Sequence, residues 1–122
     1  MDINCFLNVD CMEYMKQMSA NSVDFTLTDI PYGEVSRKTS GLSQLKSLDT
    51  LGAADATTFN TLEFCKEVLR VTKNMICIFC GREQFSEIFS FFAKQKGTVR
   101  PIVWEKNKSS TIKWTICLFE WC

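Results

Sequence analysis

Segments with the two-residue period of a β-strand alternate along this chain with segments of helical period. Strands that alternate with helices build an α/β fold, in which helices flank a mainly parallel sheet. The connection between the last two strands is short, so we expect the last strand to be antiparallel. The expected strands are 3–9, 23–29, 75–80, 99–104 and 111–119, and the expected helices are 11–18, one that begins at Asn60, and 82–96.

Local signals support several of these elements. Asn60 is followed three residues later by Glu63, as in a capping box, and Phe59 can pack against Phe64 as a hydrophobic staple. Gly97 is placed to cap the helix over 82–96. Three sets of side chains are then predicted to face the core: Met12, Met15 and Met18; Leu62, Cys65 and Leu69; and Phe85, Ile88, Phe89, Phe92 and Ala93.

Composition excludes several classes of protein. The 122 residues suit one domain, and 14 Lys and Arg balance 14 Asp and Glu, so any surface that binds nucleic acid must be local. Histidine is absent and the seven cysteines form an odd number, which together predict reduced, mostly buried thiols in a cytoplasmic protein and no metal site. No apolar run is long enough to span a bilayer, so no membrane partner is expected.

The strand over 23–29 ends in the sequence Asp29-Ile30-Pro31-Tyr32-Gly33. Pro31 restricts its own backbone and that of Ile30, which aims the Asp29 carboxylate and the Ile30 carbonyl toward one point beside the ring of Tyr32. Two acceptors and an aromatic plane suit an aromatic amine, whose two N–H groups they hold while its ring stacks. The same acceptors stabilise positive charge that develops on the nitrogen during methyl transfer.

Residues 22–33 resemble the catalytic motif of the DNA N6-adenine and N4-cytosine methyltransferases, usually written (Asp/Asn/Ser)-Pro-Pro-(Tyr/Phe). Residues 8–11 resemble the segment just upstream in that family, and the resemblance extends to about residue 108. It implies part of a Rossmann-like, class I methyltransferase sheet, with S-adenosylmethionine as cofactor and DNA as partner. A restriction–modification role and adenine N6, in preference to cytosine N4, are implied as well.

The resemblance also implies roles for individual residues. Asp29 and the Ile30 carbonyl would bind the target amine, Pro31 would shape the turn, and Tyr32 would stack on a base flipped out of the duplex. Asp10, with the backbone near Cys11, would bind the adenosine part of the cofactor, and Asp29 would lie next to it. In the loop over 34–57, which is long enough to be functional or mobile, Arg37, Lys38 and Lys46 are candidates for phosphate contacts.

The chain also departs from the family pattern. Ile30 stands where a first proline is usual, and the five glycines never form the glycine-rich cofactor loop. We therefore expect residues 1–122 to be one truncated catalytic domain, and the strand over 23–29 to have an open edge that pairs with a second copy, a complementary fragment or strand 3–9. A remnant without catalysis that binds DNA or protein is the alternative, and methylation of RNA or of protein amides stays open.

Overall fold

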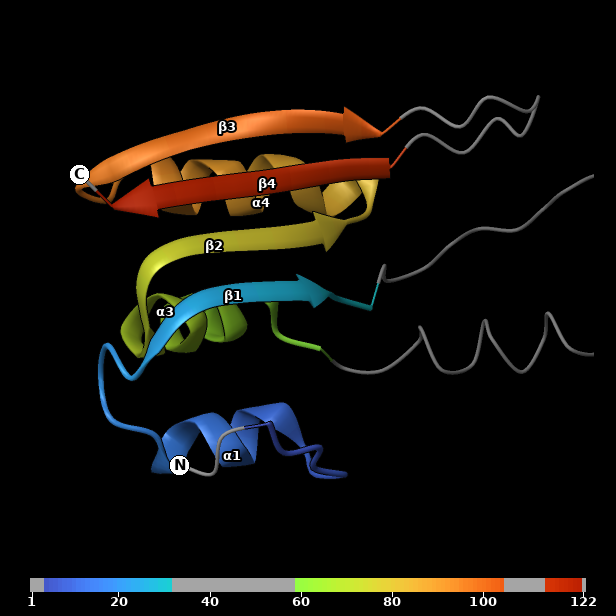
Figure 1. Cartoon of the computed structure of the whole chain (residues 1–122). Coiled ribbons are helices and arrows are strands. Elements are labelled where there is room, and N and C mark those ends of the chain that lie inside the picture. The colour runs from blue at the N-terminus through green and yellow to red at the C-terminus, as the bar shows by residue number, and fades with distance from the viewer. Residues whose placement is uncertain (1–3, 32–58, 105–113, 122) are drawn as a thin grey trace, which may run out of the picture.

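A computed structural model describes residues 4–31, 59–104 and 114–121 of the chain (Figure 1). Within these residues, four strands form one mixed sheet in the order β1-β2-β4-β3, and three helices pack beside it. The strands are β1 (Val23–Asp29), β2 (Thr72–Cys80), β3 (Gly97–Trp104) and β4 (Trp114–Trp121), and the helices are α1 (Cys11–Gln17), α3 (Thr61–Val71) and α4 (Arg82–Ala93).

The α/β class is confirmed, but the prediction of a mainly parallel sheet is wrong. β1 and β2 are parallel, whereas β4 lies antiparallel between β2 and β3 and pairs with both. Because both neighbours of β4 oppose its direction, β2 and β3 still run the same way, so three of the four strands point in one direction. The antiparallel orientation of the last strand, β4, is as expected. Because β4 lies between β2 and β3, these two strands do not pair with each other.

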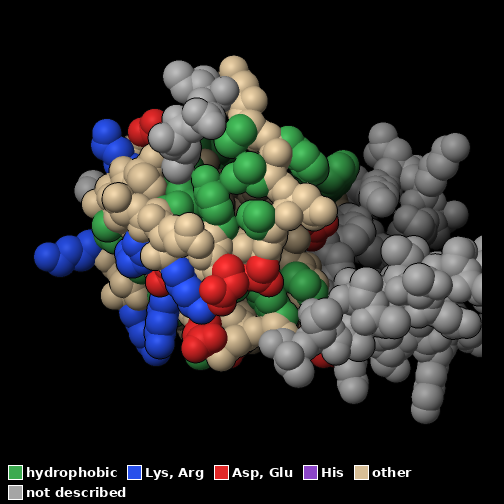
Figure 2. Space-filling view, turned by 90° about the horizontal axis from the view of Figure 1, so that it is seen from below, with side chains coloured by type: hydrophobic (Ala, Val, Ile, Leu, Met, Phe, Trp, Pro, Cys, Tyr) green, Lys and Arg blue, Asp and Glu red, His purple; other side chains and the backbone are tan. Residues whose placement is uncertain are grey.

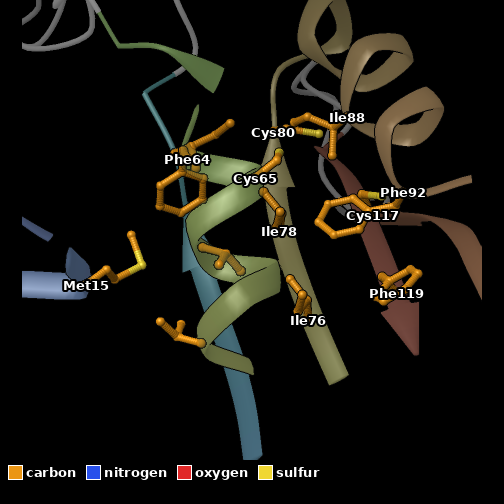
Figure 3. Close-up of a cluster of buried hydrophobic side chains, with 13 residues drawn as sticks. Met15, Phe64, Cys65, Ile76, Ile78, Cys80, Ile88, Phe92, Cys117 and Phe119 are labelled. Carbon is orange, nitrogen blue, oxygen red and sulfur yellow. The ribbon is translucent and has the colours of Figure 1, made fainter. Parts of the chain in front are cut away.

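One hydrophobic core lies between the sheet and the two helices α3 and α4 (Figure 3). Ile76 and Ile78 of β2 face these helices and are fully buried, as is Phe92 of α4, whose ring centroid lies 4.9 Å from that of Phe119 in β4. Cys77 is half-buried and Cys80 is buried, as expected for two positions that face opposite sides of a strand. Burial of the apolar side chains that α3 and α4 share with β2 and β4 holds the sheet together on this face.

The helices begin where the sequence indicates. The side chain of Asn60 accepts a hydrogen bond from the N–H of Glu63 at 3.1 Å, and the rings of Phe59 and Phe64 lie 5.2 Å apart, so the cap and the staple are both confirmed. Met15 is buried, and Met12 and Met18 pack against the core as predicted.

Two predicted core positions and one predicted cap are wrong. Leu62 is 39% exposed, because the helix turns Phe64 and Val68 toward the sheet instead. Ala93 is exposed at the last residue of α4. Gly97 does not cap α4, since Lys94 occupies the C-cap position, and Gly97 is the first residue of β3.

The predicted strand over 3–9 is also wrong for the residues that the structure describes. Residues 4–10 form no strand, and every one of them is exposed, with Phe6 at 96%. A strand is stabilised only by a neighbour that accepts its backbone hydrogen bonds, and β1 pairs with β2 alone. Residues 4–10 therefore have the apolar alternation of a strand but no neighbouring strand to pair with their backbone.

Some expectations fall outside the described residues. Tyr32 and the whole loop over 34–57, with Arg37, Lys38 and Lys46, lie there. In the part of the chain that is described, no helix has both the length and the apolar character needed to cross a membrane. The same residues contain no cluster of three or more cysteine or carboxylate side chains able to hold a metal ion.

Candidate functional site

A cleft of about 980 Å³ lies between the first turn of α1 and the first two turns of α3. Asp10 and Cys11 line it on one side, Phe59 and Asn60 on the other, and Pro31 contributes from the turn that follows β1. The structure thus brings Asp10 and Cys11, from one segment that the sequence singles out, to the same opening as Pro31, from the other. Asp29 and Ile30 do not line this cleft, and Tyr32 lies outside the described residues.

Asp10 is the N-cap of α1. Its Oδ1 accepts hydrogen bonds from the N–H groups of Met12 at 2.9 Å and Glu13 at 3.1 Å, which satisfies two otherwise unpaired donors of the helix. Both bonds end on the same carboxylate oxygen, which leaves Oδ2 as an acceptor for a ligand in the cleft. Cys11 follows as the first residue of α1, and both residues are exposed.

The turn after β1 is held from two sides. Ile30 is 3% exposed and packs in the core, and its N–H donates to the carbonyl of Phe79 at 3.2 Å. Asp29, in contrast, is exposed at the last position of the strand. The buried Ile30 therefore fixes the backbone on one side, while the adjacent Asp29 is exposed to solvent.

Gln84 of α4 contacts the segment after β1, and the sequence did not single it out. Its Nε2 donates to the carbonyl of Pro31 at 2.6 Å, and its Oε1 accepts from the N–H of Gly81 at 3.0 Å. One side chain thus joins the turn after β1 to the first turn of α4, across 53 residues of sequence. The only available signal was Gln84 at the third position of a helix, where the side chain commonly reaches back to the N-cap backbone.

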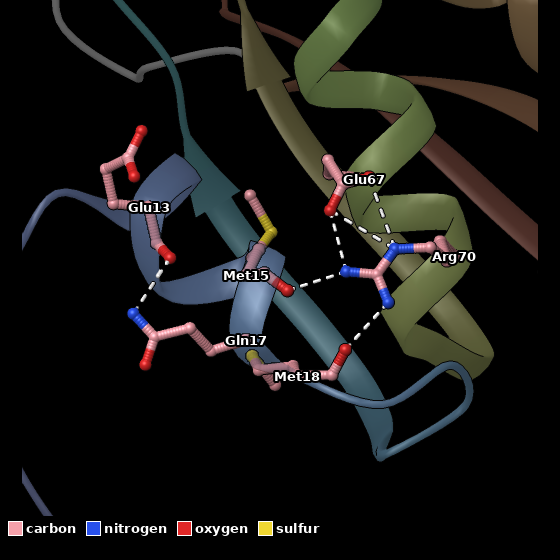
Figure 4. A network of polar contacts seen from close by, with 6 residues as sticks. All are labelled: Glu13, Met15, Gln17, Met18, Glu67 and Arg70. Carbon is pink, nitrogen blue, oxygen red and sulfur yellow. Dashed lines mark hydrogen bonds and ion pairs between the residues drawn. The ribbon is translucent and has the colours of Figure 1, made fainter.

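Arg70 fixes α1, and with it Asp10, against α3 (Figure 4). Its guanidinium donates to the carbonyl of Met15 at 2.6 Å and to that of Met18 at 2.7 Å, at the end of α1 where unpaired carbonyls remain. It also pairs with Glu67 at 2.7 Å. Hydrogen bonds from Arg70 hold the pKa of Glu67 below its ordinary value. The position of α1 relative to α3, and with it the shape of the cleft between them, therefore depends on Arg70.

The cleft carries more acidic than basic side chains. Four carboxylates and two ammonium groups line it, namely those of Asp10, Glu13, Glu63, Glu67, Lys16 and Lys66. Lys16 bonds to Glu13 at 2.7 Å, which raises the pKa of the lysine, and the charges of Glu63 and Asp10 raise it further. With Phe59, Met12 and Pro31 as apolar walls, this opening suits a ligand that combines a planar apolar part with hydroxyl groups or positive charge.

Three cysteines of the hydrophobic core are buried and unsuited to nucleophilic chemistry. Burial raises the pKa of Cys65 and of Cys117 to about 12. Burial, followed by the negative charge of Asp29, raises the pKa of Cys80 to about 11. A thiol with such a pKa holds its proton at neutral pH, and the thiolate is the reactive form.

Comparisons with known proteins give no assignment: no family model matches the chain, and no curated protein matches it.

Proposed function

We propose that this chain is the catalytic part of a DNA amino-methyltransferase of the class I, Rossmann-like type, which transfers a methyl group from S-adenosylmethionine to a base amino nitrogen. The observation that carries the proposal is the cleft in which Asp10 meets the turn at Pro31, next to the exposed carboxylate of Asp29. In open α/β sheets, ligands bind at the carboxyl ends of the strands, and this turn follows the carboxyl end of β1.

The residues of the cleft fit the adenosine and sulfonium parts of the cofactor. Oδ2 of Asp10 can accept from a ribose hydroxyl or an adenine amine, the apolar walls can hold the adenine ring, and the excess of carboxylates suits a sulfonium cation. Asn60, Lys16 and Lys66 are described lining groups able to donate hydrogen bonds to the amino acid carboxylate. The cofactor supplies an electrophilic methyl group on positively charged sulfur.

The remaining chemistry belongs to the turn after β1. The Asp29 carboxylate accepts a hydrogen bond from the target amine and stabilises the positive charge that develops on its nitrogen. The buried Ile30 and the hydrogen bond from Gln84 to Pro31 keep this turn in place, so that the acceptor is positioned before the base arrives. Adenine N6 is the proposed target in preference to cytosine N4.

A second candidate function is a DNA- or protein-binding module without independent catalysis. The use of Asp10 as a helix cap supports it, because the carboxylate has a structural task whether or not a ligand binds. The lack of a glycine-rich cofactor loop in the sequence supports it as well. The two candidates differ in cofactor affinity, which the first requires and the second does not.

Calorimetric titration with S-adenosylmethionine, with and without duplex DNA, tests the proposal. We expect binding that Asp10→Asn weakens, because asparagine keeps the helix cap but removes the charge. Transfer of a labelled methyl group to DNA should fall by about a hundredfold or more in Asp29→Ala, because the acceptor for the target amine is removed. Asp24→Ala, at the opposite end of β1, is the matched control.

The outcomes separate the candidates. Loss of methyl transfer in Asp29→Ala but not in Asp24→Ala supports the enzyme, and nucleoside analysis of the product distinguishes N6-methyladenine from N4-methylcytosine. If the wild-type chain, in the presence of DNA, neither binds S-adenosylmethionine nor transfers labelled methyl to the DNA, the methyltransferase proposal is wrong.

A further inference from the structure

The two edges of the sheet differ in how they are protected. β3 forms one edge and carries Arg100 and Pro101 in its middle, two residue types that prevent further pairing because a long cationic side chain is strongly hydrated and proline lacks an N–H. β1 forms the other edge and has no lysine, arginine, proline or glycine in its seven residues. Its side chains of Phe25 and Leu27 are 49% and 61% exposed.

The backbone of β1 has a definite side available for pairing. The N–H of Ile30 donates to Phe79 of β2, and because backbone groups alternate along a strand, Thr28 and Thr26 also turn their backbone groups to β2. The N–H and C=O groups of Phe25 and Leu27 therefore point away from β2. Among the described residues, no other strand lies on that side.

The charged groups of this edge lie toward the ends of β1, at Asp24, which is 4.0 Å from Lys73, and at Asp29, whereas the surface beside its start is largely apolar. A second cleft, of about 480 Å³, lies beside the start of β1, and none of the side chains that line it is charged. Its lining includes Leu7 and Val9 of the N-terminal segment, Tyr14 and Met15 of α1, and Val23 of β1. Figure 2 shows hydrophobic side chains gathered over the face seen from below, next to a group of acidic and basic side chains. A strand that enters here must itself be uncharged over its middle residues.

We propose that two copies of this chain associate by antiparallel pairing of their β1 strands about a two-fold axis at Thr26. In this register Phe25 of each copy faces Leu27 of the other, so the outward backbone groups of both residues are paired and two apolar contacts form. Asp24 faces Thr28 of the second copy and Asp29 faces Val23, so that no carboxylate faces another. The middle of β1, Phe25-Thr26-Leu27-Thr28, is the uncharged strand that the edge requires.

Sedimentation velocity over a range of concentrations tests the proposal and does not depend on methyltransferase activity. We expect a reversible dimer whose dissociation constant rises about tenfold or more in Leu27→Lys, because the substitution removes two apolar pairs and brings two ammonium groups to the interface. Val103→Lys on the opposite edge is the matched control, since Val103 is 63% exposed there. Circular dichroism checks that each variant stays folded. A wild-type chain that is folded and monomeric at every concentration overturns the proposal.

The register is tested by cross-linking, in a background where Cys5, Cys11 and Cys122 are serine. Directly opposed residues without mutual hydrogen bonds have Cα atoms about 4.5 Å apart, within the range that a disulfide spans. Thr26→Cys should therefore form a disulfide-linked dimer on mild oxidation. Thr28→Cys should not, because the two copies of residue 28 lie apart. A dimer that forms without linkage at residue 26, or that links equally at 28, refutes the β1 pairing.

Discussion

Gln84 connects the turn after β1 to α4, and Gln84→Met should destabilise the chain by an amount that follows from two hydrogen bonds. Methionine keeps the length of the side chain and its helix propensity but can neither donate to Pro31 nor accept from Gly81. Each neutral hydrogen bond contributes about 0.5–1.5 kcal/mol. Because all three residues are half-buried, water replaces part of the loss, and we expect a decrease of about 1–2 kcal/mol in the free energy of unfolding.

Urea unfolding followed by tryptophan fluorescence measures this difference, with a midpoint that falls by roughly 1 M. All variants are compared at one protein concentration, since association changes apparent stability. Gln17→Met is the control: Gln17 is exposed on α1 and makes a single bond of 3.4 Å within its own helix. If Gln84→Met unfolds at the same urea concentration as this control, Gln84 does not hold the turn and the argument for a preorganised site fails.

Three further predictions concern other contacts. Gly97→Ala should lower stability by about 1–3 kcal/mol in the same assay, because an added Cβ would press on the backbone of β4 and on a core ring, and an unchanged midpoint would contradict this. Arg70→Gln should raise hydrogen exchange in α1 and reduce the acid sensitivity of folding; the pKa of Glu67 is lowered in the folded state, so its stabilisation is present above the ordinary pKa and is lost as the pH falls through the lowered value. If stability falls with decreasing pH in Arg70→Gln as it does in the wild type, the ion pair between Arg70 and Glu67 does not contribute to folding. At pH 8, peptide mapping after alkylation should find Cys5 modified and Cys65, whose pKa is raised to about 12, unmodified until urea is added; early modification of Cys65 would contradict its burial.

Much of the local structure was predictable because its causes lie within a few residues. The cap at Asn60, the staple of Phe59 on Phe64, and the strand over 23–29 each depend on side chains less than eight positions apart. For the same reason the alternation of strands and helices sufficed to predict the α/β class.

The contacts that the sequence did not reveal join distant residues. The bonds from Gln84 to Pro31 and from Arg70 to Met18 and Met15 span 52 to 55 positions, and no local pattern marks their ends. The insertion of β4 between β2 and β3, and the failure of residues 4–10 to form a strand, depend on which backbone is available for pairing. Strand pairing satisfies hydrogen bonds between chain segments that only the folded structure brings together. Period and composition therefore determined most of the elements, whereas the tertiary structure decided their neighbours and left residues 4–10 without a strand.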